Sequence, residues 1–346
     1  MKEKFNIAII GVGMWGSTHV DFFQKDRRAK VLWVCDSIDE RMKAAQTKFK
    51  VPKATKDYQK ILADPEVDAV VVASPPYTHA RYDIEVMQAG KHLIAEKPMT
   101  TNLEDAMRVV EEAKKHPELV ILEGSARHAR LNPKFEFVKS LIRQGKLGQV
   151  YYIHHVALNQ GTFIEYNPKG IWSMTKALAG GGPYLDWGVY DLSFHLGILD
   201  DKPELVSLRS FTITGLRDLS DKVPVVDVEM HGATYMEFTE GLTYYFERGS
   251  GVHGELPNST RIYGTKGGLA FRYTTWEPNT IEYFYSEKEP KKEVLKVDMS
   301  AAPRHDHAAF VTHFLDCLQG KAKPMMTVDL AAKHLKILFR ILKDGS

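Results

Sequence analysis

The sequence has only two cysteines, Cys35 and Cys317, among its 346 residues. They lie far apart and do not have the spacing of metal ligands. A single possible pair is also too few for the disulfide framework that holds small secreted domains together. We therefore expect both cysteines to be buried as small hydrophobic side chains.

Long apolar runs and a strong net charge are also missing. No apolar stretch reaches the roughly 18 residues of a membrane-spanning helix, and the apolar run at the start is too short for a secretory signal. The 46 Lys and Arg residues nearly balance the 44 Asp and Glu residues, so no global field attracts nucleic acid or an anionic membrane. These absences predict a soluble cytoplasmic protein that acts on small molecules and binds neither nucleic acid nor a membrane.

The length and the 44% hydrophobic content favour two domains over a single core. From residue 5 to about 123, short apolar runs alternate with amphipathic segments, which is typical of βα units on a parallel sheet. The expected strands are Phe5–Ile10, Val31–Cys35, Ala69–Ala73, His92–Ala95 and Leu119–Leu122. Capping-box spacings predict helix starts at Ser37 with Glu40 and at Thr101 with Glu104.

The pattern changes beyond residue 123. A helix from Asn132 to about Gln144 precedes a strand over Gly148–Ala157, and residues 204–285 alternate as in a mainly antiparallel sheet. Two helical patterns, about Asp306–Gln319 and Val328–Lys343, follow. We predict an α/β protein, with a doubly wound parallel sheet over residues 1–125 and an α+β domain over residues 126–346.

Three glycines after the first strand have the spacing of a dinucleotide-binding loop. They are Gly11, Gly13 and Gly16, with Met14 and Trp15 between the last two. Glycines at these positions allow a tight turn, a close approach of the backbone to a pyrophosphate and packing of the helix on the strand, while the helix N-terminus faces the anion. Because a strand precedes the loop and a helix follows it, we predict a Rossmann dinucleotide site.

Asp36 ends the next strand, 20 residues after Gly16. A carboxylate at this point accepts hydrogen bonds from the adenosine ribose and repels a 2′-phosphate, so it favours NAD as the cofactor. Arg41 lies nearby in the sequence and could pair with such a phosphate, which leaves NADP open. The alternative for Arg41 is a solvated position on the helix surface.

Two further motifs end strands of the same sheet. Because the carboxyl ends of parallel strands share one edge, where open α/β sheets bind ligands, we expect residues of these motifs beside the cofactor. They are Ser74 and Pro75 in the first motif, and Glu96 and Lys97 in the second. A lysine at such an edge is ordinarily solvated, whereas one at the mouth of a nicotinamide site could act on a substrate hydroxyl.

A third motif, Gly180–His195, opens with three glycines and contains Asp186 and Tyr190. If Pro183–Leu199 is one helix, steps of about 100° per residue place Asp186 and Tyr190 on one side and His195 on the opposite side. A separate apolar stripe would then hold the helix on its domain while the polar edge faces a cleft.

With these three motifs in order, the chain resembles the family of glucose-fructose oxidoreductase, inositol dehydrogenase and MocA over nearly its whole length. The resemblance implies an NAD(P)-binding Rossmann domain, and then a substrate-binding domain whose large open sheet forms the contacts of a homodimer or homotetramer. It also implies hydride transfer between the nicotinamide and a hydroxyl or carbonyl carbon of a sugar, polyol, cyclitol or related ring.

The resemblance also implies that His79, in the first motif, contacts the cofactor near the nicotinamide; the alternative is a helix-start residue with no chemical role. The resemblance implies catalytic roles for Lys97, Asp186 and Tyr190. Many members have histidine where this chain has Tyr190, and the tyrosine version is similar to dimeric dihydrodiol dehydrogenase. A tyrosine, with a pKa of about 10, is a poor base near neutrality, so we expect the Lys97 ammonium to stabilise its phenolate. The alternative is that Lys97 itself carries the proton. Asp186 would orient a substrate hydroxyl or the lysine.

Two other functions stay open at this point: a dinucleotide-sensing regulator, and an enzyme that retains the nicotinamide as a bound redox group for two coupled half-reactions. The same fold could serve a non-catalytic dinucleotide-sensing regulator, although the proton-transfer groups favour an enzyme. The histidines around Arg304–His307, with His313, invite a metal site, but Asp306 is better placed to cap the helix that follows, and we predict no metal. His154 and His155 are neighbours on a strand and should point to opposite faces.

Overall fold

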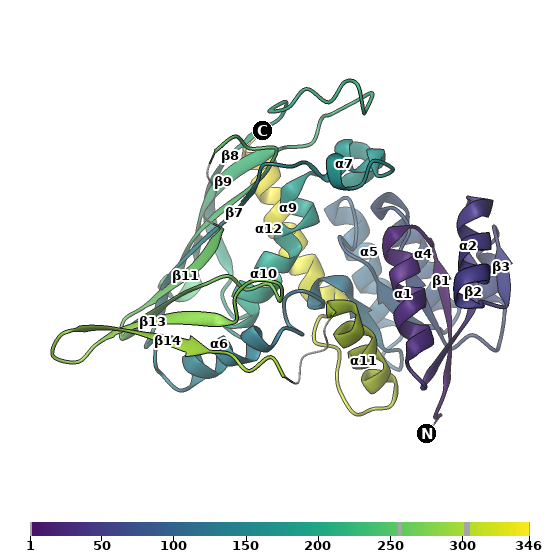
Figure 1. The fold of residues 1–346 in the computed structure, drawn as a ribbon, viewed down its shortest axis with the longest axis horizontal. Coiled ribbons are helices and arrows are strands. Elements are labelled where there is room, and N and C mark those ends of the chain that lie inside the picture. The colour runs from purple at the N-terminus through teal and green to yellow at the C-terminus, as the bar shows by residue number, and fades with distance from the viewer. Residues whose placement is uncertain (1, 255–257, 301–304, 346) are drawn as a thin grey trace. The chain divides into compact units, whose positions relative to one another are not determined.

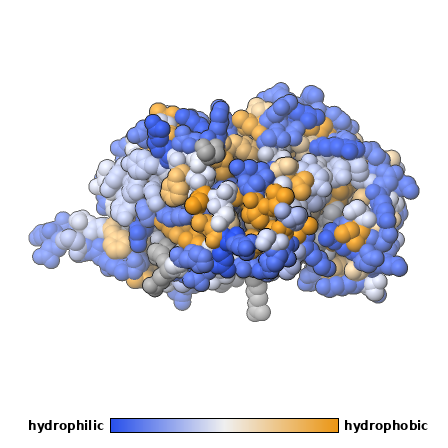
Figure 2. Space-filling model, turned by 90° about the horizontal axis from the view of Figure 1, so that it is seen from above, coloured by the Kyte–Doolittle hydropathy of each residue, from blue (hydrophilic) through white to orange (hydrophobic). Residues whose placement is uncertain are grey.

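The computed structural model describes residues 2–254, 258–300 and 305–345. The chain forms two compact units, residues 1–127 with 303–332 and residues 128–302 with 333–346. Hydrophilic side chains cover much of the face in Figure 2, with hydrophobic side chains grouped in patches between them. Both cysteines are buried and unpaired with each other, as expected. Among the helices of the described residues, none is long and apolar enough to cross a membrane.

The first unit is built on a six-stranded parallel sheet in the order β3-β2-β1-β4-β5-β6 (Figure 1). Its strands are β1 (Phe5–Ile10), β2 (Ala29–Cys35), β3 (Lys53–Thr55), β4 (Ala69–Val72), β5 (His92–Ala95) and β6 (Ile121–Glu123). Residues of the central strands such as Ile7 and Val71 are fully buried, because helices cover both faces of such a sheet. The order reverses between β1 and β4, which confirms the doubly wound sheet.

Five helices and two short 3-10 turns lie between these strands or directly after the last one. They are α1 (Met14–Lys25), α2 (Asp39–Phe49), α3 (Gln59–Leu62), η1 (Pro76–Thr78), α4 (His79–Gln88), α5 (Leu103–Lys114) and η2 (Gly124–Ala126). Both predicted capping boxes are wrong. Ile38 is the N-cap of α2 and makes no side-chain cap. At α5 the side chain one residue later, Asn102, reaches the N–H of Asp105 and replaces Thr101 as the cap.

Helix α11 (Asp306–Leu318) belongs to the first unit although it lies late in the sequence. The units therefore differ from the predicted domains, since the second domain was expected to continue from residue 126 to 346. The reason is packing on α1, where Phe23 meets the fully buried Phe314 edge to face with ring centroids 6.3 Å apart. Arg28 also pairs with Asp316 at 2.6 Å.

The start of α11 corrects another expectation. His305, not Asp306, occupies the N-cap position, and its ring nitrogen accepts a hydrogen bond from the N–H of His307 at 3.3 Å. Asp306 is the first helical residue, where its negative carboxylate interacts favourably with the positive end of the helix dipole.

The second unit contains an eight-stranded sheet in the order β14-β13-β12-β11-β7-β10-β9-β8. Its strands are β7 (Val150–Asn159), β8 (Leu205–Ile213), β9 (His231–Phe238), β10 (Thr243–Ser250), β11 (Ser259–Gly264), β12 (Gly267–Phe271), β13 (Thr280–Ser286) and β14 (Pro290–Lys296). Among the described strands of this sheet, only β7 and β10 pair in parallel. The predicted large, mainly antiparallel sheet is confirmed, and it is open because β8 and β14 are its two edge strands and do not pair with each other.

The helices and turns of this unit are α6 (Pro133–Arg143), α7 (Phe163–Tyr166), η3 (Ile171–Met174), α8 (Lys176–Ala179), α9 (Pro183–Asp186), α10 (Gly188–Gly197) and η4 (Thr239–Gly241). The first part of α12 (Val328–Asp344) belongs to the first unit and the rest to the second. Asn132 caps α6 as predicted.

The single helix expected over Pro183–Leu199 is wrong. The helix is interrupted at Trp187, whose ring stacks on that of His128 with centroids 5.6 Å apart. Every residue of α10 is buried, so it has no exposed polar edge of the kind expected. Phe194 meets Phe271 of β12 with ring centroids 5.8 Å apart and His195 meets Tyr244 of β10 at 5.4 Å, which shows that α10 packs on the sheet.

Candidate active site

The glycine loop lies at the carboxyl end of β1. Gly11 has a φ of +87°, and a Cβ there would lie 2.6 Å from the backbone nitrogen of Ser74. A Cβ on Gly16 would lie 1.8 Å from the carbonyl oxygen of Gly11. These two glycines are required by backbone packing alone.

Gly13 is different, because the space beside it is open. It is the N-cap of α1, and the nearest described atom to an added Cβ would be the guanidinium nitrogen of Arg41 at 3.8 Å. No side chain caps the first turn, which contains the half-exposed Met14 and Trp15. An open glycine at a helix N-terminus without a side-chain cap fits the pyrophosphate of a dinucleotide.

Asp36 shapes the same loop. It follows β2, is 7% exposed, and accepts hydrogen bonds from the N–H of Val12 at 2.9 Å and of Ile38 at 3.0 Å. Arg41 lies 3.6 Å from this carboxylate and is partly exposed. The end of β2 therefore presents a fixed negative charge with one cation beside it.

His79 connects the loop after β4 to the segment after β5. Its Nε2 lies 2.7 Å from the carbonyl oxygen of Ser74, and its Nδ1 lies 2.9 Å from that of Pro98. Burial lowers the pKa of this imidazole, and a neutral ring donates to only one of the two oxygens at a time. Ser74 and Pro75 lie in this turn, where the Ser74 hydroxyl is 2.6 Å from that of Thr78. His79 has the contacts of a residue that holds two loops together.

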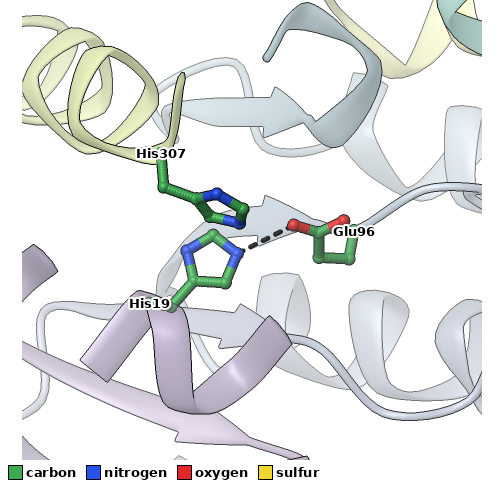
Figure 3. A group of neighbouring side chains, drawn as sticks. All are labelled: His19, Glu96 and His307. Carbon is green, nitrogen blue, oxygen red and sulfur yellow. Dashed lines mark hydrogen bonds and ion pairs between the residues drawn. The ribbon is translucent and has the colours of Figure 1, made fainter. Parts of the chain in front are cut away.

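Glu96 lies at the centre of a buried polar cluster (Figure 3). One carboxylate oxygen is 2.8 Å from Nε2 of His19 and also accepts a hydrogen bond from Arg127. The other oxygen accepts the backbone N–H of Lys97 at 3.1 Å. Burial opposes ionisation, but the charge of Arg127 and the contact with His19 hold the pKa of Glu96 well below its usual range. The cluster fixes the backbone on which Lys97 stands.

His19, Glu96 and His307 also bring ligand atoms within 4.8 Å of one another (Figure 3). Two histidines and a carboxylate are a donor set that zinc accepts. However, Arg127 binds the same carboxylate oxygen as His19, and its positive charge would repel a metal ion placed there. We interpret the group as an ion-pair cluster, and the absence of a metal stays a prediction.

Glu123 was not singled out from the sequence. It ends β6 opposite Ala95 of β5, is 1% exposed, and accepts hydrogen bonds from the N–H and hydroxyl of Ser125. Burial raises its pKa to about 7, and the charge of Glu96 adds to this increase. Its position at a third strand end on the same edge is the signal that could have revealed it.

In the second unit, Asp186 is the last residue of α9 and Tyr190 lies in α10. The Tyr190 side chain is 1% exposed and packs edge to face on His128, with centroids 4.7 Å apart. Asp186 is partly exposed. The structure thus collects the glycine loop, Asp36, Ser74, Glu96 and Lys97 on one edge of the first sheet, and Asp186 with Tyr190 in the second unit.

A second buried carboxylate, Asp191, lies directly after Tyr190. It pairs with two guanidinium nitrogens of Arg248, at 2.6 and 2.8 Å, and accepts the hydroxyl of Tyr273 at 2.8 Å. Nε2 of His155 is 3.0 Å away. Burial opposes its ionisation, but Arg248 and His155 hold the pKa of Asp191 far below its usual range. This network was missed because its members are scattered over the sequence.

The remaining histidines behave largely as expected. His154 stacks on Tyr245 at 4.9 Å, while His155 lies on the buried face of β7, so the two point to opposite sides. His195 is fully buried and bonds to the hydroxyls of Tyr244 at 2.7 Å and Thr260 at 3.0 Å. These contacts agree with the packing role expected for His195.

The contacts of Asp36 and Arg41 predict cofactor preference. Asp36→Asn keeps an acceptor for Val12 but removes the charge, so we expect the ratio of NADPH to NADH affinity to rise about tenfold, or ~1.4 kcal/mol. Arg41→Ala should weaken NADPH binding and leave NADH binding almost unchanged. Fluorescence titration of both cofactors measures the ratio, and an unchanged ratio in Asp36→Asn would contradict the assignment.

The raised pKa of Glu123 predicts how stability depends on pH. An acid with a folded pKa near 7 and an unfolded value near 4.5 stabilises the fold fully below pH 4.5, and the contribution is lost as the pH rises through 7. The free energy of unfolding should therefore fall between pH 5 and 8 by on the order of 2–3 kcal/mol. Glu123→Gln should flatten this fall in urea denaturation, and the exposed control Glu104→Gln should not.

Two family models match the chain. Residues 5–123 match the oxidoreductase family with an NAD-binding Rossmann fold, GFO_IDH_MocA, and residues 135–270 match the GFO/IDH/MocA C-terminal domain. The resemblance seen in the sequence and the NAD cofactor expected from the glycine loop and Asp36 are thereby confirmed.

Known relatives agree with this match. Myo-inositol 2-dehydrogenase of Thermotoga maritima is 27% identical over 259 residues, which cover 75% of this chain and 70% of that enzyme. Trans-1,2-dihydrobenzene-1,2-diol dehydrogenase of Xenopus laevis is 28% identical over 233 residues, 67% of this chain and 63% of that enzyme, so this match spans less than two thirds of the relative. A levoglucosan dehydrogenase solved in complex with NADH shares the fold, with a TM-score of 0.84 at 18% identity over 99% of this chain and 97% of that one. The chain belongs to the GFO/IDH/MocA family of NAD-binding oxidoreductases.

Proposed function

We propose that this protein is an NAD-dependent dehydrogenase or reductase that acts on a hydroxyl or carbonyl carbon of a sugar, cyclitol or related ring. The observation that carries the proposal is the position of Lys97, which lies on the same sheet edge as the glycine loop with its backbone held by the buried Glu96. The relatives named for myo-inositol and a dihydrodiol both act on cyclic alcohols, which supports the substrate class.

The first unit supplies the cofactor site. Gly11, Gly13 and Gly16 let the backbone approach the pyrophosphate, and Asp36 accepts the ribose hydroxyls. The remaining contacts that we propose come from Met14, Trp15, Ser74, Pro75, His79, Glu96 and Lys97. When bound, NAD supplies the acceptor or donor of the hydride.

The chain's own side chains move the proton. In the oxidative direction the substrate hydroxyl loses its proton either to Tyr190 or to Lys97, and the charge of the lysine stabilises the oxygen that becomes negative. Asp186, partly exposed beside Trp187, orients a neighbouring hydroxyl. A dinucleotide sensor on this fold would need none of these proton-transfer groups, so their presence favours the enzyme.

Two substitutions test these roles. Lys97→Met and Tyr190→Phe should each lower kcat/KM by roughly 10² to 10⁴, the usual value of acid–base help, and Tyr190→Phe should leave the affinity for NADH unchanged. Turnover is followed at 340 nm on sugars, cyclitols and dihydrodiols, with the exposed Lys60→Met and Tyr166→Phe as controls. If only one variant loses activity, that residue carries the proton.

Other outcomes would contradict the proposal. If both variants turn over substrate as fast as the parent, the catalytic roles proposed for Lys97 and Tyr190 are wrong. No turnover by the parent on the whole panel, together with tight NADH binding and a stable protein partner, would favour the sensor.

The second sheet suggests that the protein assembles with itself. Its exposed face carries aromatic residues that the strand register places on one side, and we call it the aromatic face. They are Tyr152, Phe211, Tyr235, Tyr245, Tyr263 and Phe284. We propose that a second copy covers this face in a homodimer or homotetramer, because large exposed apolar patches mark interfaces.

Charge on the aromatic face should prevent assembly. We expect Tyr235→Lys with Phe284→Lys to sediment as a monomer, while the parent and the control Tyr77→Lys, which alters an exposed tyrosine of the first unit, keep the same larger mass. Sedimentation velocity at micromolar concentration measures this. A monomeric parent would contradict the proposal.

A further inference from the structure

The segment between β12 and β13 is held in place by a buried lysine. Lys134 of α6 is fully buried, and its ammonium group donates to the backbone carbonyl oxygens of Arg272 at 2.9 Å, Thr274 at 2.6 Å and Glu277 at 3.1 Å. Three carbonyl acceptors match the three donors of an ammonium group. This arrangement fixes the backbone on both sides of residue 276.

Two further contacts hold the same segment. The side-chain amide of Asn132 donates to the carbonyl oxygen of Tyr273. The Tyr273 hydroxyl in turn donates to Asp191 at 2.8 Å. Hydrogen bonds therefore hold the segment both to the start of α6 and to the buried network of Asp191, the residue after Tyr190.

This fixed segment presents a tryptophan to solvent. Trp276 is 60% exposed, and its ring meets His128 edge to face at 5.3 Å and Trp187 edge to face at 5.9 Å. His128 also packs edge to face on Tyr190 at 4.7 Å. The rings of His128, Trp187 and Trp276 thus form an aromatic corner around Tyr190, with Trp276 as its exposed member.

Core packing does not explain this tryptophan, because most of its surface is exposed. Contact with a second copy through the aromatic face does not explain it either. Trp276 touches Trp187, at the start of α10, and α10 packs on the buried side of the sheet through His195 and Tyr244. A large aromatic ring held rigidly toward solvent beside a candidate proton-transfer residue has the features of a preorganised ligand wall.

The chemistry of the corner indicates the ligand. An aromatic face attracts a flat set of C–H groups, because the ring face carries the negative part of its quadrupole. Pyranoses and cyclitols fix several C–H bonds on one face and their hydroxyls around the edge, whereas an open-chain polyol has no such face. The partly exposed Asp186, next to Trp187 in sequence, offers a carboxylate for the hydroxyl edge.

We propose that Trp276, supported by Trp187, is the wall against which the apolar face of a cyclic polyol packs, so that the protein selects ring substrates over open-chain ones. This proposal rests on the proposed function, since it concerns the substrate that reaches Tyr190. Lys134 is a positioning residue for the wall.

Kinetics on matched ligands test the wall. With NAD saturating, the parent should use a cyclic polyol such as myo-inositol or a methyl pyranoside at least tenfold better in kcat/KM than sorbitol or glycerol. Trp276→Ala should raise KM for the ring substrate about tenfold and leave kcat within about twofold, and Trp276→Phe should restore most of the affinity. Tyr166→Ala, at another exposed aromatic residue, is the matched control.

A binding measurement separates this proposal from the proposed function. In saturation-transfer NMR on the NADH-bound protein, irradiation of the aromatic protons should transfer to the C–H protons of the ring ligand, and the transfer should disappear in Trp276→Ala. If this holds while no ligand turns over, the wall stands and the proposed dehydrogenase activity fails.

The opposite results overturn the wall. Equal use of ring and open-chain substrates, or an unchanged KM in Trp276→Ala, would reject the wall while the dehydrogenase activity stands. A changed sedimentation mass in Trp276→Ala with unchanged KM would assign Trp276 to an interface instead. Unchanged thermal unfolding and NADH affinity of the variant show that its fold is intact.

Discussion

The candidate site in the first unit depends on the contacts made by the buried carboxylate of Glu96. A charge removed from water is tolerated only when partners compensate it, and here Arg127, His19 and the backbone N–H of Lys97 do so. Loss of Arg127 would leave the Glu96 charge buried without its cationic partner. The same contacts fix the end of β5, so the group that keeps the fold intact also holds Lys97 at the sheet edge.

The second unit uses the same physical device. Asp191, the residue after Tyr190, forms a buried ion pair with Arg248. Tyr273, in the segment that carries Trp276, donates its hydroxyl hydrogen bond to the same carboxylate. Lys134 compensates its own charge with three backbone carbonyl oxygens of that segment. Buried charges thus fix the backbone on both sides of the aromatic corner, and they leave the exposed Trp276 little freedom to lose when a ligand binds.

Patterns local in the sequence were sufficient to predict both sheets and the nucleotide loop. The apolar runs and the three glycines predicted a doubly wound parallel sheet with its nucleotide loop, because buried strands and tight turns restrict the residues that can form them. The alternation over residues 204–285 predicted the antiparallel sheet. The cap of α5 was missed by one residue, since Thr101 and Asn102 both have capping side chains and only the backbone geometry selects Asn102.

The sequence by itself determined the fold class, the glycine loop and the candidates Lys97, Asp186 and Tyr190. Tertiary structure alone decided which distant side chains meet them. His307 reaches His19 from about 290 residues further along the chain because α11 packs on α1, and Lys134 holds the segment of Trp276 from another helix. No periodicity encodes such contacts, because they depend on how separate elements pack. The break at Trp187 likewise lies where distant residues meet the chain, since its ring stacks on His128 and meets Trp276 edge to face.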